Sequence, residues 1–126
     1  MRKLSMLAAA VMAAALFTGC ASFQVTKANE LSGEKLSTSG TPIAHLNADN
    51  WGLYLFMIPL ITGSSDEAGK TVFLQDTVNV EKMAPMVAAK SKELGASKTL
   101  NMISRTQATG WMFYFKEVQI SANAVK

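Results

Sequence analysis

The apolar run at the N-terminus decides which part of this chain can belong to a folded domain. Arg2 and Lys3 form a short positive region, and the apolar segment Leu4–Phe17 follows it. A secretory signal core has about 7–15 residues, and a membrane-spanning helix needs ~20, so the segment fits the first and is too short for the second. We therefore expect residues 1–19 to be a cleaved signal peptide.

The apolar segment ends at Phe17–Cys20, and Cys20 is the only cysteine of the chain. This ending resembles the lipobox of bacterial lipoproteins, in which small residues precede a cysteine that is lipidated and becomes the new N-terminus. Phe17 departs from that pattern, because leucine is usual at its position. The resemblance implies cleavage between Gly19 and Cys20, with acyl chains such as palmitate on Cys20. Because Ala21 rather than aspartate follows, it also implies sorting to the outer membrane of a Gram-negative envelope, facing the periplasm. The alternative is an ordinary secretory signal that leaves a free thiol.

Most of the net positive charge of the chain lies in the expected signal peptide. The 126 residues carry 12 Lys and Arg against 9 Asp and Glu, and Arg2 and Lys3 supply two of the three net positive charges. The 107 residues after the signal suit one domain. A single cysteine excludes an internal disulfide framework and a cysteine-based zinc cluster. The chain has no basic stripe or nucleic-acid recognition motif, so we expect no nucleic-acid partner.

Two regions are expected after the signal peptide. Residues 20–42 are rich in Ser, Thr, Gly, Lys and Glu and have no sustained hydrophobic period, which predicts a lipidated N-terminus and a flexible tether. The alternative for part of this region is that Phe23–Thr26 pairs as an extra edge strand. Residues 43–126 are expected to form one domain.

The first half of the domain is expected to contain strands. Ile43–Leu46 alternates weakly, Asn47–Asn50 is a turn-forming cluster, and Trp51–Ile58 is densely apolar up to Pro59. These features predict two strands joined by a turn. An exposed loop over residues 63–69 and a short strand over Thr71–Leu74 follow.

The second half of the domain is expected to contain a helix and two further strands. The spacing of Met83, Met86, Val87 and Leu94 predicts a helix from near Lys82, with Pro85 in its first turn and Gly95 at its end. Strands are expected over Thr99–Ser104 and Trp111–Ala124, separated by a polar loop over Thr106–Gly110, with a bulge at Lys116–Glu117. The predicted class is α+β: a small antiparallel sheet of four to five strands in the order β-β-α-β-β, with one packed helix.

Aromatic residues offer the best candidate for a binding surface. One expected strand carries Trp51, Tyr54 and Phe56, and another carries Trp111, Phe113, Tyr114 and Phe115. Within this aromatic group, the residues we name for a partner surface are Trp51, Tyr54, Trp111 and Tyr114. One helix does not easily cover both faces of a sheet, so these side chains are candidates for a surface that meets a protein partner, a glycan or the membrane interface. The alternative is that both sheet faces are covered and that the aromatic side chains form core.

The chain offers few residues for catalysis. His45 is the only histidine, and no serine lies in a nucleophile elbow. We therefore expect that the protein is not an enzyme and binds no cofactor. A hydrolase centred on His45 is the weaker hypothesis. Met83 and Met86 with His45 could ligate Cu(I), although methionine on an apolar helix face usually fills a core. The expected function is a non-enzymatic binding or structural module of the cell envelope, anchored to the membrane through Cys20. The alternative is a periplasmic Cu(I) or metal-binding protein.

Overall fold

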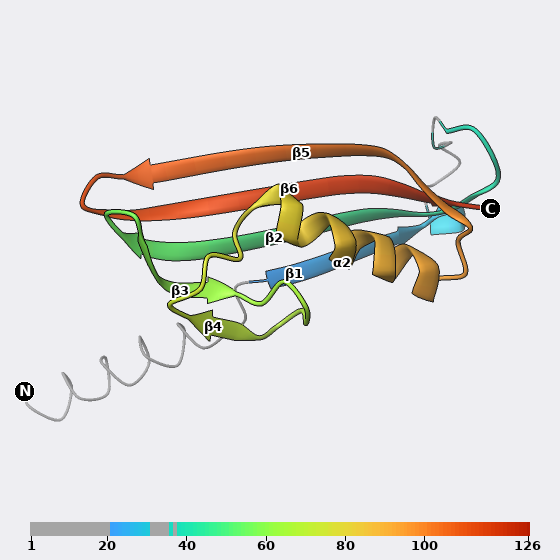
Figure 1. Ribbon diagram of the computed structural model, residues 1–126. Coiled ribbons are helices and arrows are strands. Elements are labelled where there is room, and N and C mark those ends of the chain that lie inside the picture. Colours follow the sequence, from blue (N-terminus) through green and yellow to red (C-terminus); the bar gives the residue numbers. More distant parts are fainter. Residues whose placement is uncertain (1–20, 31–35, 37) are drawn as a thin grey trace, which may run out of the picture.

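The protein is built on one antiparallel sheet with a helix across one face (Figure 1). The computed structural model describes residues 21–30, 36 and 38–126. Its elements in chain order are β1 (Ala21–Lys27), the 3-10 helix η1 (Ala28–Glu30), β2 (Pro42–Leu55), β3 (Ile58–Gly63), β4 (Thr71–Phe73), α2 (Val80–Glu93), β5 (Lys98–Gly110) and β6 (Phe113–Val125). The strand order is β4-β3-β2-β6-β5, and β1 pairs with β2 beside β3.

This architecture is largely β, which corrects the predicted α+β class. The described residues contain six strands and one α-helix rather than four to five strands in the order β-β-α-β-β. The two strands expected around residues 43–58 are a single strand, β2, while β1 and β3 are additional strands on its edge. The difference arises from pairing between segments that are distant in the sequence, which local propensity does not encode.

The turn expected at Asn47–Asn50 lies in the middle of β2, and this prediction is wrong. Asp49 pairs with Ser22 of β1 on one side and with Gln119 of β6 on the other. The buried Asn50 side chain donates from Nδ2 to the carbonyl of Gly63 at 3.1 Å. Because strands on both sides pair with this segment, the turn preference of its residues is overridden.

Residues 21–27 form β1, as the edge-strand alternative for Phe23–Thr26 predicts. All seven residues pair in register with residues 44–50 of β2. Phe23 and Val25 pack against the core, and Ser22 Oγ donates to Asp49 Oδ1 at 2.8 Å. β1 therefore starts at the residue that follows Cys20, while Gly19 and Cys20 lie outside the described residues.

The hydrophobic core lies between α2 and the sheet face formed by the even-numbered residues of β2 and β6. The expected alternation in β6 is confirmed, because its four inward side chains between residues 118 and 124 are fully buried. The fully or nearly fully buried apolar residues of this layer are Ala44, Leu46, Ala48, Tyr54, Val78, Met83, Val87, Val118, Ile120, Ala122 and Ala124.

The helix begins two residues earlier than predicted. Asn79 caps it, and its Oδ1 accepts a hydrogen bond from the backbone N–H of Lys82 at 2.8 Å. Pro85 therefore lies in the second turn, where its missing N–H leaves the carbonyl of Glu81 without a helical partner. Glu81 is exposed to solvent, which limits the cost. The expected end of the helix is confirmed, since Gly95 has a φ of +85°.

The last two strands form a long hairpin. The polar loop expected over Thr106–Gly110 belongs to β5, which pairs with β6 as far as Gly110 and Tyr114. Trp111 and Met112 connect the two strands. The bulge predicted at Lys116–Glu117 is absent, because these residues pair in unbroken register with β2 and β5. The irregularity lies instead in β5, between Leu100 and Ile103.

Candidate functional site

The two faces of the sheet differ in what covers them. In Figure 1, α2 lies against one face, and among the described residues no helix or strand is packed over the opposite face. Along β2, the buried even-numbered residues 44–54 alternate with half-buried odd-numbered residues. The odd-numbered side chains point to the uncovered face, which we call the open face.

The open face is polar at one end and apolar at the other. Near the start of β2 it carries His45, Asn47 and Asp49, and these residues pair with Asn123, Ser121 and Gln119 of β6. Towards the end of β2 it carries an apolar group that we call the open-face patch. The patch consists of Trp51, Leu53, Leu55, Ile61, Phe73, Phe113 and Phe115.

Strand register brings the open-face patch together from four strands. Leu53 of β2 is paired with Ile61 of β3 on one side and with Phe115 of β6 on the other. Ile61 is in turn paired with Phe73 of β4. The rings of Trp51 and Phe115 are 5.9 Å apart, and Phe115 is 54% exposed. The patch is therefore a continuous apolar surface that is only partly shielded from water.

Two turns extend this apolar surface at the end of the sheet. We call them the tip: Phe56 and Met57 between β2 and β3 together with Ile58, the first residue of β3, and Trp111 and Met112 between β5 and β6. The backbone N–H of Phe56 donates to the carbonyl of Met112 at 2.7 Å, which joins the two turns. Met57 is 89% exposed and Trp111 is 87% exposed. Large apolar side chains at this exposure are unusual unless something covers them.

The four residues predicted for a partner surface separate into two pairs. Trp51 lies on the open face, and Trp111 lies at the tip. Tyr54 and Tyr114 lie on the side of α2, where their rings stack at 5.0 Å and Tyr54 is buried. The sequence places Phe113 and Phe115 in the same aromatic group without showing which face of the sheet they occupy. Their parity could have indicated it, because it is opposite to that of Val118–Ala124 and so directs them away from the core.

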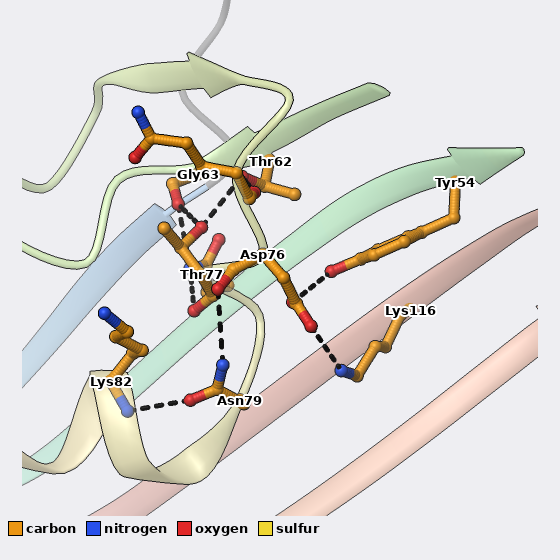
Figure 2. Close-up of polar contacts among 10 residues, drawn as sticks. Tyr54, Thr62, Gly63, Asp76, Thr77, Asn79, Lys82 and Lys116 are labelled. Atoms are coloured by element: carbon orange, nitrogen blue, oxygen red, sulfur yellow. Dashed lines mark hydrogen bonds and ion pairs between the residues drawn. The ribbon is translucent and has the colours of Figure 1, made fainter. Parts of the chain in front are cut away.

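Tyr54 anchors the loop before α2 rather than forming a surface. Figure 2 shows Asp76 between Tyr54 and Lys116. The Tyr54 hydroxyl donates to Asp76 Oδ1 at 2.6 Å, and Lys116 Nζ lies 3.7 Å from Asp76 Oδ2. Burial, and then the hydrogen bond and negative charge of Asp76, raise the pKa of the Tyr54 hydroxyl far above its ordinary value. Tyr54 is therefore a neutral hydrogen-bond donor in the folded protein.

A second set of hydrogen bonds fixes the same loop to β3 (Figure 2). Thr62 Oγ1 donates to the carbonyl of Gln75 at 2.8 Å, and Thr77 Oγ1 donates to the carbonyl of Gly63. A cleft of about 460 Å³ lies beside these residues. It is lined by Ser64, Ser65, Asp66, Val72, Gln75, Thr77, Glu81, Lys82, Pro85, Met86 and Ala89.

Two hydroxyl groups at this cleft, those of Ser64 and Thr77, serve the fold. Ser64 Oγ accepts hydrogen bonds from the backbone N–H groups of Asp66 and Glu67, both at 3.2 Å, and so shapes the loop after β3. Thr77 is occupied by its contacts with β3. No histidine lies near either residue to activate a hydroxyl, because His45 is on the open face. The arrangement explains how the loop is held and supplies no nucleophile paired with a base.

The residues considered for metal binding are not brought together. Met83 and Met86 are buried on α2, against the covered face of the sheet. His45 is on the open face, where its Nδ1 lies 2.7 Å from Asn123 Oδ1. The sheet therefore separates the imidazole from the two thioethers. Among the described residues, no group of three or more His, Cys, Asp or Glu side chains could hold a metal ion.

Comparisons with known proteins leave the site to be interpreted from its own geometry. No family model, curated protein or solved structure matches this chain. Within the described ranges, no helix has the length and apolar character that crossing a membrane requires. The strongest feature of the molecule is the exposed apolar surface formed by the open-face patch and the tip.

Proposed function

We propose that this protein is a lipid-anchored, non-enzymatic module of the bacterial cell envelope that binds a protein partner through its open-face patch. The observation that carries the proposal is the alignment of apolar side chains from four strands on a sheet face that none of the described helices and strands covers. The anchor rests on the sequence at Cys20.

The anchor is supported by the lipobox-like ending of the N-terminal segment. A lipoprotein carries more than one acyl chain, and each buried CH₂ contributes about 0.8 kcal/mol, so attachment through Cys20 is stable where a single chain is not. β1 starts at Ala21 and is paired along its whole length with β2. The lipidated residue would thus be joined directly to an edge of the sheet.

The binding role is supported by the composition and rigidity of the patch. Partner surfaces are enriched in aromatic residues and depleted of charge at their centres, and Trp51, Phe113 and Phe115 supply such a centre. These side chains stand on paired strands, so little backbone order would be lost on binding. The polar half of the same face, with His45 and Asp49, would supply a hydrogen-bonding rim.

The non-enzymatic assignment is supported by the chemistry of the polar groups. Tyr54, Asp76 and Lys116 interact with one another, and Thr62 and Thr77 bond to backbone carbonyls. Groups used in this way hold the fold and are poorly placed to carry a reaction.

Photocrosslinking in cells tests the partner surface. A photoreactive residue in place of Phe115 should give a discrete protein adduct, whereas one in place of Thr106 should not. Thr106 is a matched control, because it is exposed on β5 and directed to the other side of the sheet. The adduct should disappear when Leu53→Asp places a charge in the patch. Equal adducts from both positions, or an adduct that survives Leu53→Asp, would count against the proposal.

Lipid labelling tests the anchor separately. Cys20→Ala should abolish incorporation of labelled fatty acid, because the thiol that receives the lipid is removed. Ser22→Ala is the control, since it lies two residues away and should leave labelling unchanged. Labelling that persists in the Cys20→Ala variant would refute the anchor.

A further inference from the structure

We propose that the tip of the sheet inserts into the lipid–water interface of the membrane that holds Cys20. The proposal rests on the anchoring through Cys20 and assigns the tip a role separate from the partner surface of the open face. The ligand is the interfacial region of a phospholipid bilayer.

The tip has the composition of an interfacial segment. Residues 50–65, 71–75 and 106–115 contain no Asp, Glu, Lys or Arg, although charged residues make up 17% of the chain. Met57 and Trp111 are almost fully exposed, and Phe56 and Ile58 are each more than half exposed. Tryptophan favours the interface, and apolar side chains without nearby charge enter it without a desolvation penalty for ions.

The tertiary structure assembles this tip from two turns that are about fifty residues apart in the sequence. The hydrogen bond from Phe56 N–H to the Met112 carbonyl holds the turns together. Each turn closes a pair of strands whose backbone groups are already paired, β2 with β3 and β5 with β6. Because unpaired backbone groups are costly in lipid, turns braced in this way suit shallow insertion.

The position of the anchor directs the tip to the bilayer. Ala21 pairs with Asn50, and because β1 is antiparallel to β2, Ala21 is at the end of β1 that lies nearer the tip. The Cα atom of Cys20 is about 3.8 Å from that of Ala21. Phe56 is six positions after Asn50, which corresponds to about 20 Å along the strand. A lipid on Cys20 therefore keeps the tip within one domain length of the membrane.

β4 and the residue that follows it add apolar surface at the edge between the anchor and the tip, where Phe73 and Leu74 are 54% and 70% exposed. The loop that precedes β4 carries Asp66, Glu67 and Lys70, and its Gly69 N–H donates to the carbonyl of Ala21, so the part of this edge next to the anchor is charged. A domain that tilts so that Cys20 and the tip both reach the bilayer would also lay this edge against the headgroups. Anchoring makes the tip contact intramolecular, so a weak interfacial preference suffices to hold it.

Tryptophan fluorescence provides a direct test, because Trp51 and Trp111 are the only tryptophans. The full-length lipidated chain with Trp51→Phe is placed in phosphatidylethanolamine–phosphatidylglycerol vesicles, with or without bromine on the acyl chains. Trp111 fluorescence should fall about twofold with the brominated lipid, and its emission should shift to the blue. A further Met57→Asp substitution should reverse most of both effects, because the charge disfavours insertion. Met57 is almost fully exposed, so an unchanged circular dichroism spectrum should accompany that variant.

The outcomes separate this proposal from the anchor on which it rests. A chain that floats with the vesicles but shows no quenching of Trp111 would overturn the insertion of the tip and leave the anchor intact. A chain that carries no lipid and does not float would overturn both. In cells, a photoreactive residue at Met57 should label lipid, and a discrete protein adduct instead would assign the tip to the partner.

Discussion

Replacing Tyr54 by phenylalanine isolates the contribution of one buried hydroxyl to the stability of the fold. The ring of Tyr54 stays in place in this variant, stacked on Tyr114, while the hydrogen bond to Asp76 is lost. A hydrogen bond to a charged group contributes about 1.5–3 kcal/mol. The Asp76 side chain is 48% exposed and can be rehydrated, so we expect a loss near the lower end, about 1.5 kcal/mol at pH 8.

The same variant should respond differently to alkaline pH. The pKa of the Tyr54 hydroxyl is about 10 in the unfolded chain and is raised by folding, so its contribution is complete below pH 10 and is lost as the pH rises above that value. At pH 11 the unfolded tyrosine is about tenfold more ionised than neutral, which stabilises the unfolded state by about 1.4 kcal/mol. The difference in unfolding free energy between the wild type and Tyr54→Phe should therefore shrink by about 1.4 kcal/mol between pH 8 and pH 11.

Urea unfolding of both proteins at the two pH values measures this difference. A second variant, Tyr114→Phe, leaves Tyr54 as the only tyrosine, and its tyrosinate absorbance should appear only as the protein unfolds. A stability difference that stays constant up to pH 11 would refute the reasoning. A native-state titration of Tyr54 near pH 10 would also refute it.

Two further predictions concern packing and capping. Gly52→Ala should lower the unfolding free energy by about 1–3 kcal/mol, because a Cβ at this position would lie 2.6 Å from Thr62 Cγ2. Thr62→Ser removes that methyl group and should restore part of the loss in urea unfolding; no restoration would contradict the assigned clash. Asn79→Ala should cost about 1 kcal/mol by removing the cap of α2, whereas Asn79→Ser should retain most of the stability. Equal losses in the two Asn79 variants would show that the cap does not act through its side-chain oxygen.

Local sequence patterns predict the elements whose buried face can be identified from periodicity alone. The helix was predicted from the spacing of Met83, Met86 and Val87, which are buried as expected, and its end from Gly95. Strict alternation predicts the inward residues of β6 between Val118 and Ala124. The alternation is clear because polar side chains are tolerated on the open face of the sheet. The exposure of Lys92 and Glu93 on α2 also agrees with the helical periodicity.

Local patterns failed where pairing with distant strands fixes the conformation of a segment. Asn47–Asn50 has turn-forming residues, but β1 and β6 pair with it and draw it into a continuous strand. Thr106–Gly110 resembles a loop because its residues are small and polar, yet β6 extends it as an edge strand. Backbone pairing over a long register outweighs the modest preferences of individual residues.

By itself, the sequence determined the helix α2 and the amphipathic last strand β6, and both are present in the structure. The export signal over residues 1–19 stays a prediction. The helix and the strand depend on neighbours a few positions away, and periodicity records them directly. The tertiary structure decided that Tyr54 and Tyr114 serve the core, whereas Phe113 and Phe115 face outwards. It also decided that Phe56 and Met57 lie beside Trp111 and Met112. These outcomes depend on strand order and register, which are fixed by the sum of many contacts across the sheet rather than by any local stretch of residues.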